Sequence, residues 1–198
     1  MLSRQSVLTT AGLILLVGLT NYLSLKNSNS QLTKASHTLY ITGIGNNINI
    51  IQTTPAGSLD YTAHAEKIIK YSDGKSRLFH IQATDFKNNP PWHLTAFNGW
   101  AYPNNSQIDL WDQVHIFRNA GFKNKPLDFK TSQLTYYPPT DLATTDQLVQ
   151  ISEPKTHNLT TAIGLRAHPK AQTFQLISQV HSTYEPPTSH TPSTSSDS

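Results

Sequence analysis

The sequence predicts an all-β protein whose strands run antiparallel. Three observations support this fold class: apolar residues recur with a period of two, turn-forming residues separate these stretches, and helical periodicity is lacking after residue 25. Only 14% of the residues are charged, against roughly 25% in an average soluble protein, so neutral polar residues replace charge. This composition excludes a coiled coil, which needs about half Ala, Glu, Lys, Leu and Arg.

Length and composition narrow the classes of protein further. A chain of 198 residues has room for one domain of ordinary size with short appendages. It contains no cysteine, which excludes disulfides, thiolate zinc sites and a cysteine nucleophile. The net charge is +3, but the densest basic stretch is only Lys75-Ser76-Arg77, so no nucleic-acid-binding surface is predicted.

An uncharged stretch from Gln5 to Leu25 predicts a transmembrane helix over residues 7–25, after a short cytoplasmic segment of residues 1–6. A cleaved secretory signal is the alternative. It is disfavoured because no Ala-x-Ala site follows the apolar run, and because Tyr22 suits a membrane interface. The predicted span is the first in the chain, with a short segment before it and a long one after it, and this arrangement favours a cytoplasmic N-terminus. In a bacterium the rest of the chain is then periplasmic.

Two polar segments flank the expected domain. Residues 26–36 are mostly Asn, Ser, Lys, Thr and Gln, which predicts a flexible stalk. Residues 186–198 are mostly Pro, Ser and Thr, which predicts a disordered tail. The folded domain is therefore expected over residues 37–185.

The clearest strand signal alternates Leu59, Tyr61, Ala63 and Ala65 with polar residues. The phase slips near Lys67, and two continuations stay open: the apolar face resumes at Ile69, or a bulge shifts it to Ile68. Further strands are predicted around residues 79–83, 92–96, 108–116, 127–137, 148–151 and 174–184. Turn signals separate them at Asp73-Gly74, Asn89-Pro90-Pro91, Pro103-Asn104-Asn105, Asn119-Ala120-Gly121 and Pro138-Pro139.

This spacing predicts an antiparallel meander, either of packed sheets or of a rolled sheet. A faint internal repeat supports stacked β-hairpins. The hexapeptide Leu110–His115 matches Leu176–His181 at four of six positions. Stacked hairpins would form an extended sheet with two open ends.

Catalytic and metal-binding signatures are lacking in the sequence. There is no Gly-x-Ser-x-Gly elbow, no Gly-rich phosphate loop and no HExxH, and Asp109 and Asp112 lie on opposite faces of a strand. We therefore expect no enzyme, no cofactor and no metal site. Five histidines fall on the polar phase of their strands, where solvation explains them: His64, His80, His93, His115 and His181.

The apolar residues that alternate along the strands have two interpretations. They form a closed core by default, but they line a slot if the sheet stack is open along one side. Alternation alone does not distinguish these. The slot residues would be Leu59, Tyr61, Phe79, Trp92, Leu110 and Val180.

A set of landmarks follows the N-terminal segment in order. They are Pro55-x-Gly57-x-Leu59-x-Tyr61, Tyr71-Ser72-Asp73, Phe79, Phe86, Pro91-Trp92-x-x-x-Ala96-x-x-Gly99, Ile108-x-Leu110-x-x-x-Val114, Leu134-x-Tyr136-x-Pro138, Ala143-x-Thr145, Gly164-Leu165 and Leu176-x-x-x-Val180-x-x-x-Tyr184. Their order and spacing behind a single anchor resemble the LptC family of lipopolysaccharide-export proteins. The chain departs from the family after Gly164, where Pro169 follows Arg166-Ala167-His168 and is expected to disturb a strand.

The resemblance implies a twisted antiparallel β-jellyroll, like those of LptC and LptA, preceded by one transmembrane helix in the inner membrane. It implies lipopolysaccharide transport across the periplasm, from the LptB/LptF/LptG transporter to LptA. The N-terminal sheet edge and the anchor would contact LptF and LptG, and the C-terminal edge would contact LptA. The expected acyl-chain groove comprises Leu59, Tyr61, Phe79, Ile81, Trp92, Leu94, Leu110, Val114, Leu176, Val180 and Tyr184.

Two other classes stay open. One is a membrane-anchored carbohydrate-binding or hydrolytic β-sandwich, with Trp100 and Trp111 as an aromatic platform. The other is a membrane-tethered scaffold whose interior is filled by its own side chains. An apolar groove open at both ends would favour lipopolysaccharide transport over the β-sandwich and the scaffold.

Overall fold

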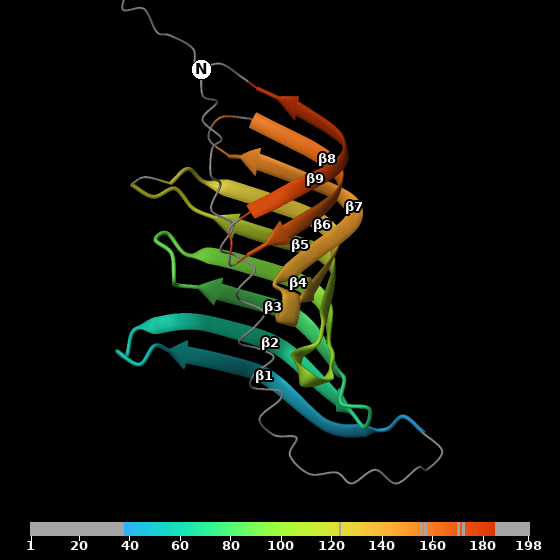
Figure 1. Ribbon diagram of the computed structural model, residues 1–198. Coiled ribbons are helices and arrows are strands. Elements are labelled where there is room, and N and C mark those ends of the chain that lie inside the picture. The colour runs from blue at the N-terminus through green and yellow to red at the C-terminus, as the bar shows by residue number, and fades with distance from the viewer. Residues whose placement is uncertain are drawn as a thin grey trace, which may run out of the picture.

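The computed structural model describes residues 38–122, 124–154, 156, 158–169, 171 and 173–184. In this part of the chain nine strands form one antiparallel sheet, in the same order as in the sequence (Figure 1). They are β1 (Ile41–Thr53), β2 (Leu59–Tyr71), β3 (Ser76–Asp85), β4 (Trp92–Ala101), β5 (Ile108–Arg118), β6 (Leu127–Tyr137), β7 (Leu142–Glu153), β8 (Asn158–His168) and β9 (Thr173–Thr183). The all-β, antiparallel prediction is confirmed.

Four predicted segments lie outside the described residues: the cytoplasmic segment at 1–6, the anchor at 7–25, the stalk at 26–36 and the tail at 186–198. No helix that could cross a membrane occurs within the described ranges.

The hairpin turns follow the predicted signals. Between β2 and β3, the Gly74 N–H donates to the Tyr71 carbonyl at 3.0 Å, and the Lys75 N–H donates to Asp73 Oδ1 at 3.0 Å. Short 3-10 turns at Pro103–Asn105 and Pro138–Thr140 connect the next hairpins. Pro169 comes directly after β8, so it ends that strand without interrupting its ladder.

Near their middle, the strands reverse which alternate residues face inward. In β2 the buried residues pass from Ala65 to Ile68, and in β3 from Leu78 to Ile81. The second continuation left open by the sequence is therefore the observed one. Positive φ angles mark this level in several strands, where left-handed backbone breaks the alternation. They occur at Asn47, His80, Asp112, Gln113, Gly164 and Gln179.

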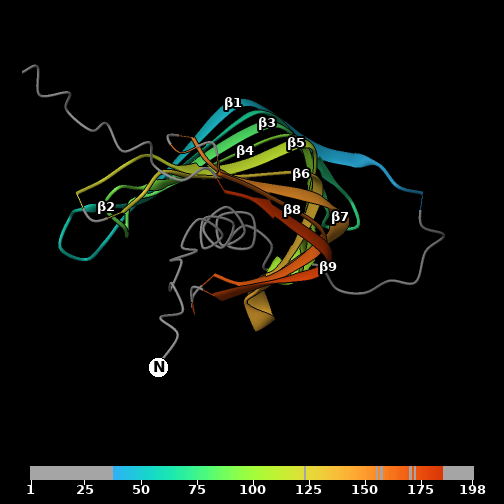
Figure 2. The same cartoon turned by 90° about the horizontal axis from the view of Figure 1, so that it is seen from above.

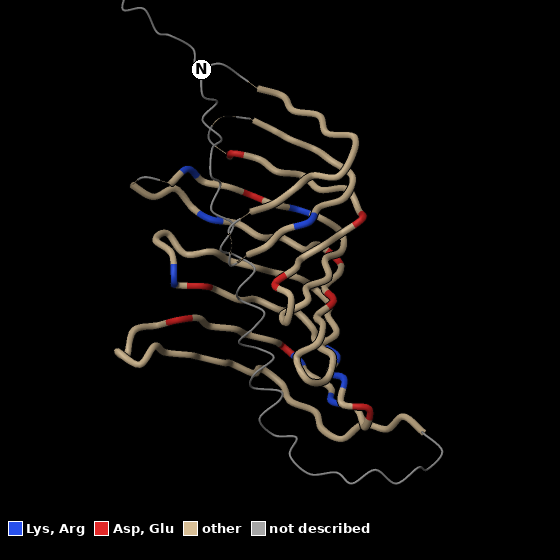
Figure 3. Tube along the Cα trace, viewed as in Figure 1, with Lys and Arg blue, Asp and Glu red and all other residues tan. Residues whose placement is uncertain are grey.

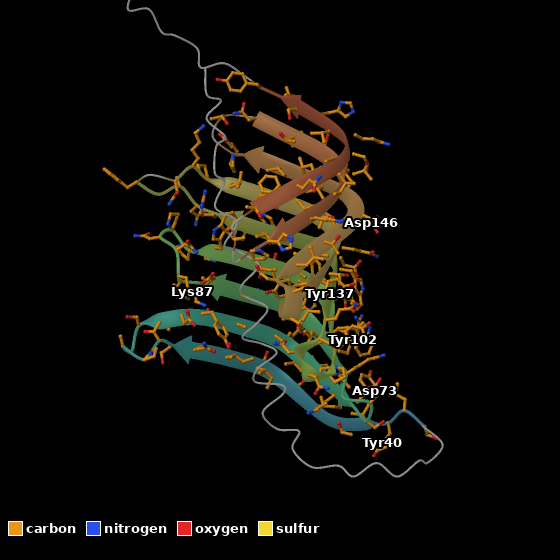
Figure 4. The ribbon with its side chains drawn as sticks, in the orientation of Figure 1. Tyr40, Asp73, Lys87, Tyr102, Tyr137 and Asp146 are labelled. Carbon is orange, nitrogen blue, oxygen red and sulfur yellow. The ribbon has the colours of Figure 1, made fainter. Side chains whose placement is uncertain are left out.

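Pairing is irregular at the same level in the later strands, for example between Trp111 and Val114 and between Thr145 and Leu148. Together these irregularities form a line across the sheet, which we call the corner. Viewed along the stack, the strands bend round so that the sheet folds over on itself (Figure 2). Figure 4 shows Asp146 at the corner, and Lys87 at the strand ends that lie away from the corner.

The corner divides the sheet into two walls. Wall A, on the Lys87 side, comprises residues 48–53, 59–65, 81–85, 92–96, 114–118, 127–131, 149–153, 158–162 and 180–183. Wall B comprises residues 41–46, 67–71, 76–79, 98–101, 108–111, 134–137, 142–145, 165–168 and 173–177.

Each wall carries one continuous row of inward residues, in which every residue pairs with the next across the ladder. The row of wall A is Ile50, Ala63, Ala83, Leu94, Ile116, Phe129, Ile151, Thr160 and Ser182. The row of wall B is Gly43, Lys70, Ser76, Ala101, Ile108, Tyr136, Ala143, Ala167 and Phe174. Because rows run across strands, both follow the length of the stack.

The corner predicts a specific sensitivity in β8. Gly164 has a φ of +83°, and a Cβ built there lies 3.0 Å from Ile177 Cβ. We expect Gly164→Ala to lower the free energy of unfolding by about 1–3 kcal/mol, measured by urea denaturation. Gly43→Ala is the matched control, because nothing lies within 4 Å of its Cβ position. Equal effects of the two substitutions would contradict the role of the corner.

Candidate functional site

The space between the two walls is the candidate site. Most of the predicted groove residues lie in this interior. Six are buried there: Tyr61, Ile81, Trp92, Leu94, Leu110 and Val114. Leu176 is half-buried and packs against them. In Figure 3 most residues of the sheet are uncharged, and the charged residues are scattered along it.

The prediction that Phe79 faces the interior is wrong. His80, with a φ of 46°, breaks the alternation, so Leu78 and Ile81 face inward and Phe79 faces outward. On the outer surface its ring lies 5.0 Å from the guanidinium carbon of Arg77.

Three other predicted residues are exposed at the margins of the sheet. Leu59 is 46% exposed at the start of β2, Val180 is 51% exposed in β9, and Tyr184, just after β9, is 68% exposed. The described part of the chain therefore leaves about half or more of each of these side chains exposed.

A cavity opens between the walls from β4 to β9. It contains about 490 Å³ of empty volume, part of it open to solvent, and almost all of its lining atoms are apolar. The space is narrow, since a water molecule fits in only a small part of it. The lining residues are Trp92, Val114, Ile116, Phe129, Lys130, Thr131, Leu134, Val149, Leu165, Ala167 and Phe174.

Several of these cavity residues were absent from the predicted groove. Phe129 and Ile116 belong to alternating stretches that the sequence does show, so a fuller reading of the period would have found them. Leu165 and Phe174 come from wall B, and only the fold brings them opposite wall A.

Polar side chains bound the interior at the free end of wall A. Asp85 is 1% exposed, and its Oδ1 accepts a hydrogen bond from the Lys87 N–H at 2.9 Å. The buried Arg118 lies with its guanidinium 4.8 Å from the Trp92 ring centroid. Asp60 Oδ2 accepts from Gln52 Nε2 at 3.0 Å, and Lys87 Nζ lies 3.3 Å from the other oxygen of Asp60.

Burial raises the pKa of Asp85, although the Lys87 N–H and ammonium act in the opposite direction. Within the described chain, Asp85 Oδ2 has no hydrogen-bond partner. The ionised form of Asp85 is therefore poorly accommodated in the folded state.

The outer face of wall B carries an aromatic stack around Arg77. The guanidinium lies 4.1 Å from the Trp111 ring centroid and 5.5 Å from that of Trp100, and Arg77 Nη2 donates to Asn98 Oδ1 at 3.0 Å. Cation–π contacts of this kind stabilise an arginine on aromatic rings. Packing on Arg77 explains the positions of Trp100 and Trp111 without a bound sugar. The stack therefore does not favour the hypothesis that these residues form a carbohydrate-binding platform.

The five histidines predicted on the polar phase lie outside the interior. His80 Nδ1 lies 2.5 Å from Glu66 Oε2, and His115 contacts Asp128. The rings of His93 and His115 both stack on Phe117, at 4.8 and 4.7 Å. Among the described residues, no group of three His, Cys, Asp or Glu side chains could hold a metal ion.

The internal repeat marks the corner. Gln113 and Gln179 occupy equivalent positions in the two hexapeptides, and both have positive φ. The same pattern of Asp or Ser, then Gln, then Val or Leu occurs at the corner of four strands. The tripeptides are 112–114, 132–134, 146–148 and 178–180. The sequence contained this signal, but only two of its four copies were recognised.

The first and last strands are the edges of the sheet, because the strand order does not close on itself. Both carry exposed aliphatic side chains. Ile44 and Ile51 lie on β1, and Ile177 and Val180 lie on β9. Unpaired main-chain groups at a sheet edge are available to a further strand.

Comparison with known proteins adds one family. The family described as "Lipopolysaccharide-assembly, LptC-related" matches residues 8–185. No curated protein sequence matches the chain.

The buried carboxyl at the end of wall A gives a pH-dependent prediction. We expect Asp85→Asn to raise the free energy of unfolding at pH 7 by on the order of 1 kcal/mol, because the amide removes a poorly accommodated charge and keeps the acceptor for the Lys87 N–H. A carboxyl whose pKa is raised by folding lowers the free energy of unfolding at high pH. This loss disappears as the pH falls towards 3.8, the pKa of the carboxyl in the unfolded chain.

The gain in Asp85→Asn should therefore shrink between neutral pH and about pH 4. Urea denaturation at a series of pH values measures it. Asp146→Asn, exposed at the corner, is the control and should behave like the parent. A destabilised Asp85→Asn at pH 7, or a gain that grows on acidification, would contradict this account.

Proposed function

The chain belongs to the LptC-related family of lipopolysaccharide-assembly proteins, and on that premise we propose that walls A and B shield the acyl chains of lipopolysaccharide while the glycolipid crosses the periplasm. The family acts in lipopolysaccharide transport and is not a family of enzymes. The proposed role is accordingly passive: the protein holds the lipid, and a partner ATPase supplies the energy.

The observation that carries this proposal is the pair of inward rows. Both cross all nine strands, and their apolar side chains run from Ile50 on β1 to Ile151 on β7 in wall A, and from Ala101 on β4 to Phe174 on β9 in wall B. Transfer of one methylene from lipid to water costs about 0.8 kcal/mol, so one fourteen-carbon chain costs on the order of 10 kcal/mol. A lipid with several such chains needs a continuous apolar surface, and the two rows together provide one from β1 to β9.

The sheet edges support the proposed partners. We propose that β1, together with the anchor, joins LptF and LptG of the LptB/LptF/LptG transporter, and that β9 joins LptA. Each main-chain hydrogen bond of an added strand contributes roughly 0.5–1.5 kcal/mol net. Docking of this kind would continue the walls, and hence the groove, into the next protein.

The proposed location follows from the family and from the hydrophobic segment at residues 7–25. We propose a single-pass protein of the inner membrane with the β-sheet domain in the periplasm. The chain would receive lipopolysaccharide beside the membrane and pass it along the stack from β1 to β9.

Adjacent residues on opposite faces of β5 test the groove. Ile116 lies in the inward row of wall A, and Phe117 faces outward, where it stacks on His93. We expect a photo-crosslinking amino acid at position 116 to label lipopolysaccharide in cells, and the same residue at position 117 to label it at least about tenfold less. Equal labelling, or none at position 116 in a functional variant, would contradict the groove.

Positions on the two edges test the partners. We expect a photo-crosslinker at Ile177 of β9 to label LptA, and one at Ile51 of β1 to label LptF or LptG, because these side chains are exposed beside unpaired main-chain groups. Phe97, exposed on the central strand β4, is the control and should label none of them. Labelling of LptA from β1 instead of β9 would reverse the proposed orientation.

A further inference from the structure

One aromatic contact joins the two walls across the interior. Phe129 lies in β6 on wall A, and Phe174 lies in β9 on wall B. Their ring centroids are 5.8 Å apart and their planes are nearly perpendicular, at 89°. The strands β7 and β8 lie between β6 and β9 in the sheet, so this contact does not follow from strand pairing.

A third ring extends the contact along wall A. The Trp92 centroid on β4 lies 6.2 Å from that of Phe129. All three side chains line the same apolar cavity. Together they form a bridge of rings from β4 across the interior to β9.

The two ends of this bridge differ in how firmly they are held. Trp92 is fully buried, whereas Phe129 and Phe174 are only half-buried. Phe174 lies on the edge strand, which has a partner on one side only. The Phe174 end is therefore the one that can move with the least loss of packing.

We propose that Phe129 and Phe174 form a clasp between the walls, and that the clasp must part before an acyl chain enters the cavity between β4 and β9. This inference rests on the proposed function, since it names the residues that control access to the same groove. The empty space is too narrow for a lipid chain while the rings touch. Separation of the walls at this contact widens it.

The energetics suit a reversible clasp. An edge-to-face aromatic pair shifts an equilibrium by about 2- to 10-fold. Entry of a long acyl chain buries far more apolar surface than the parted rings expose. The lipid would therefore open the clasp, and the clasp would close again when the lipid leaves.

A thiol-accessibility experiment tests the clasp without any lipid. The chain has no cysteine, so single cysteines report one position each. Leu165→Cys places a thiol on the cavity lining. In the full chain in phospholipid nanodiscs, Phe174→Ala should raise the maleimide labelling rate of this thiol by about 2- to 10-fold.

Two further variants separate opening from unfolding. Leu78→Cys is fully buried outside the cavity, so its labelling should stay unchanged by Phe174→Ala in a folded protein. Phe174→Leu keeps an apolar side chain without the ring contact, and should raise the rate at position 165 in the same direction. An unchanged rate at position 165 in both variants would overturn the clasp.

A crosslink tests the clasp with lipid. In F129C/F174C, a reducible bismaleimide ties the walls together. Rough-type lipopolysaccharide should then label a photo-crosslinker at position 116 several-fold less, and reduction should restore the labelling. A tie within one wall is the control: Gln150→Cys with Thr161→Cys joins paired, outward-facing residues of β7 and β8 that do not line the cavity, and should leave labelling unchanged.

The outcomes distinguish the two proposals. Labelling that is unaffected by the tie between the walls would overturn the clasp and leave the groove intact. An uncrosslinked protein that never labels lipopolysaccharide from position 116 would overturn the groove, and the thiol rates would still decide whether the clasp controls access to the cavity.

Discussion

The coordinated reversal of faces at the corner is the constraint on which the rest of the structure depends. A single sheet buries its apolar face only against another layer. Here the bend brings wall A and wall B of one sheet to face each other, so within the described residues Leu94 and Tyr136 are buried between two parts of the same sheet. Because β1 and β9 remain edges, the interior is enclosed by the walls and not by closure of the sheet.

Packing varies along the stack, and this variation places the cavity. Near the N-terminal end the inward row of wall A carries Ala63 and Ala83, which are small and fully covered. Further along it carries Ile116 and Phe129, which line the cavity, and the Phe129 ring contacts Phe174 of wall B. Protein interiors normally pack without such space. A cavity lined almost entirely by apolar atoms therefore suits an apolar ligand better than water.

The period of two predicted the inward residues on both sides of the corner in β5, but not in β3. It identified Tyr61, Trp92 and Leu110 as inward residues, and the structure buries all three. It failed at Phe79, because the left-handed residue His80 reverses the alternation, so Leu78 and Ile81 face inward and Phe79 faces outward. The strands β1 and β8 escaped prediction, since their apolar residues are mixed with Asn, Thr and Gly and show no clear alternation.

The sequence by itself determined the antiparallel β class, the turns that carry Gly, Pro or Asn signals, and most inward residues of the clearly alternating strands, because these depend on neighbouring residues and turn chemistry. Only the tertiary structure decided that Phe129 meets Phe174, that Arg77 covers Trp111, and that Asp85 is buried. Those contacts join residues far apart in the chain. They depend on the angle at which the sheet folds, which no local pattern encodes.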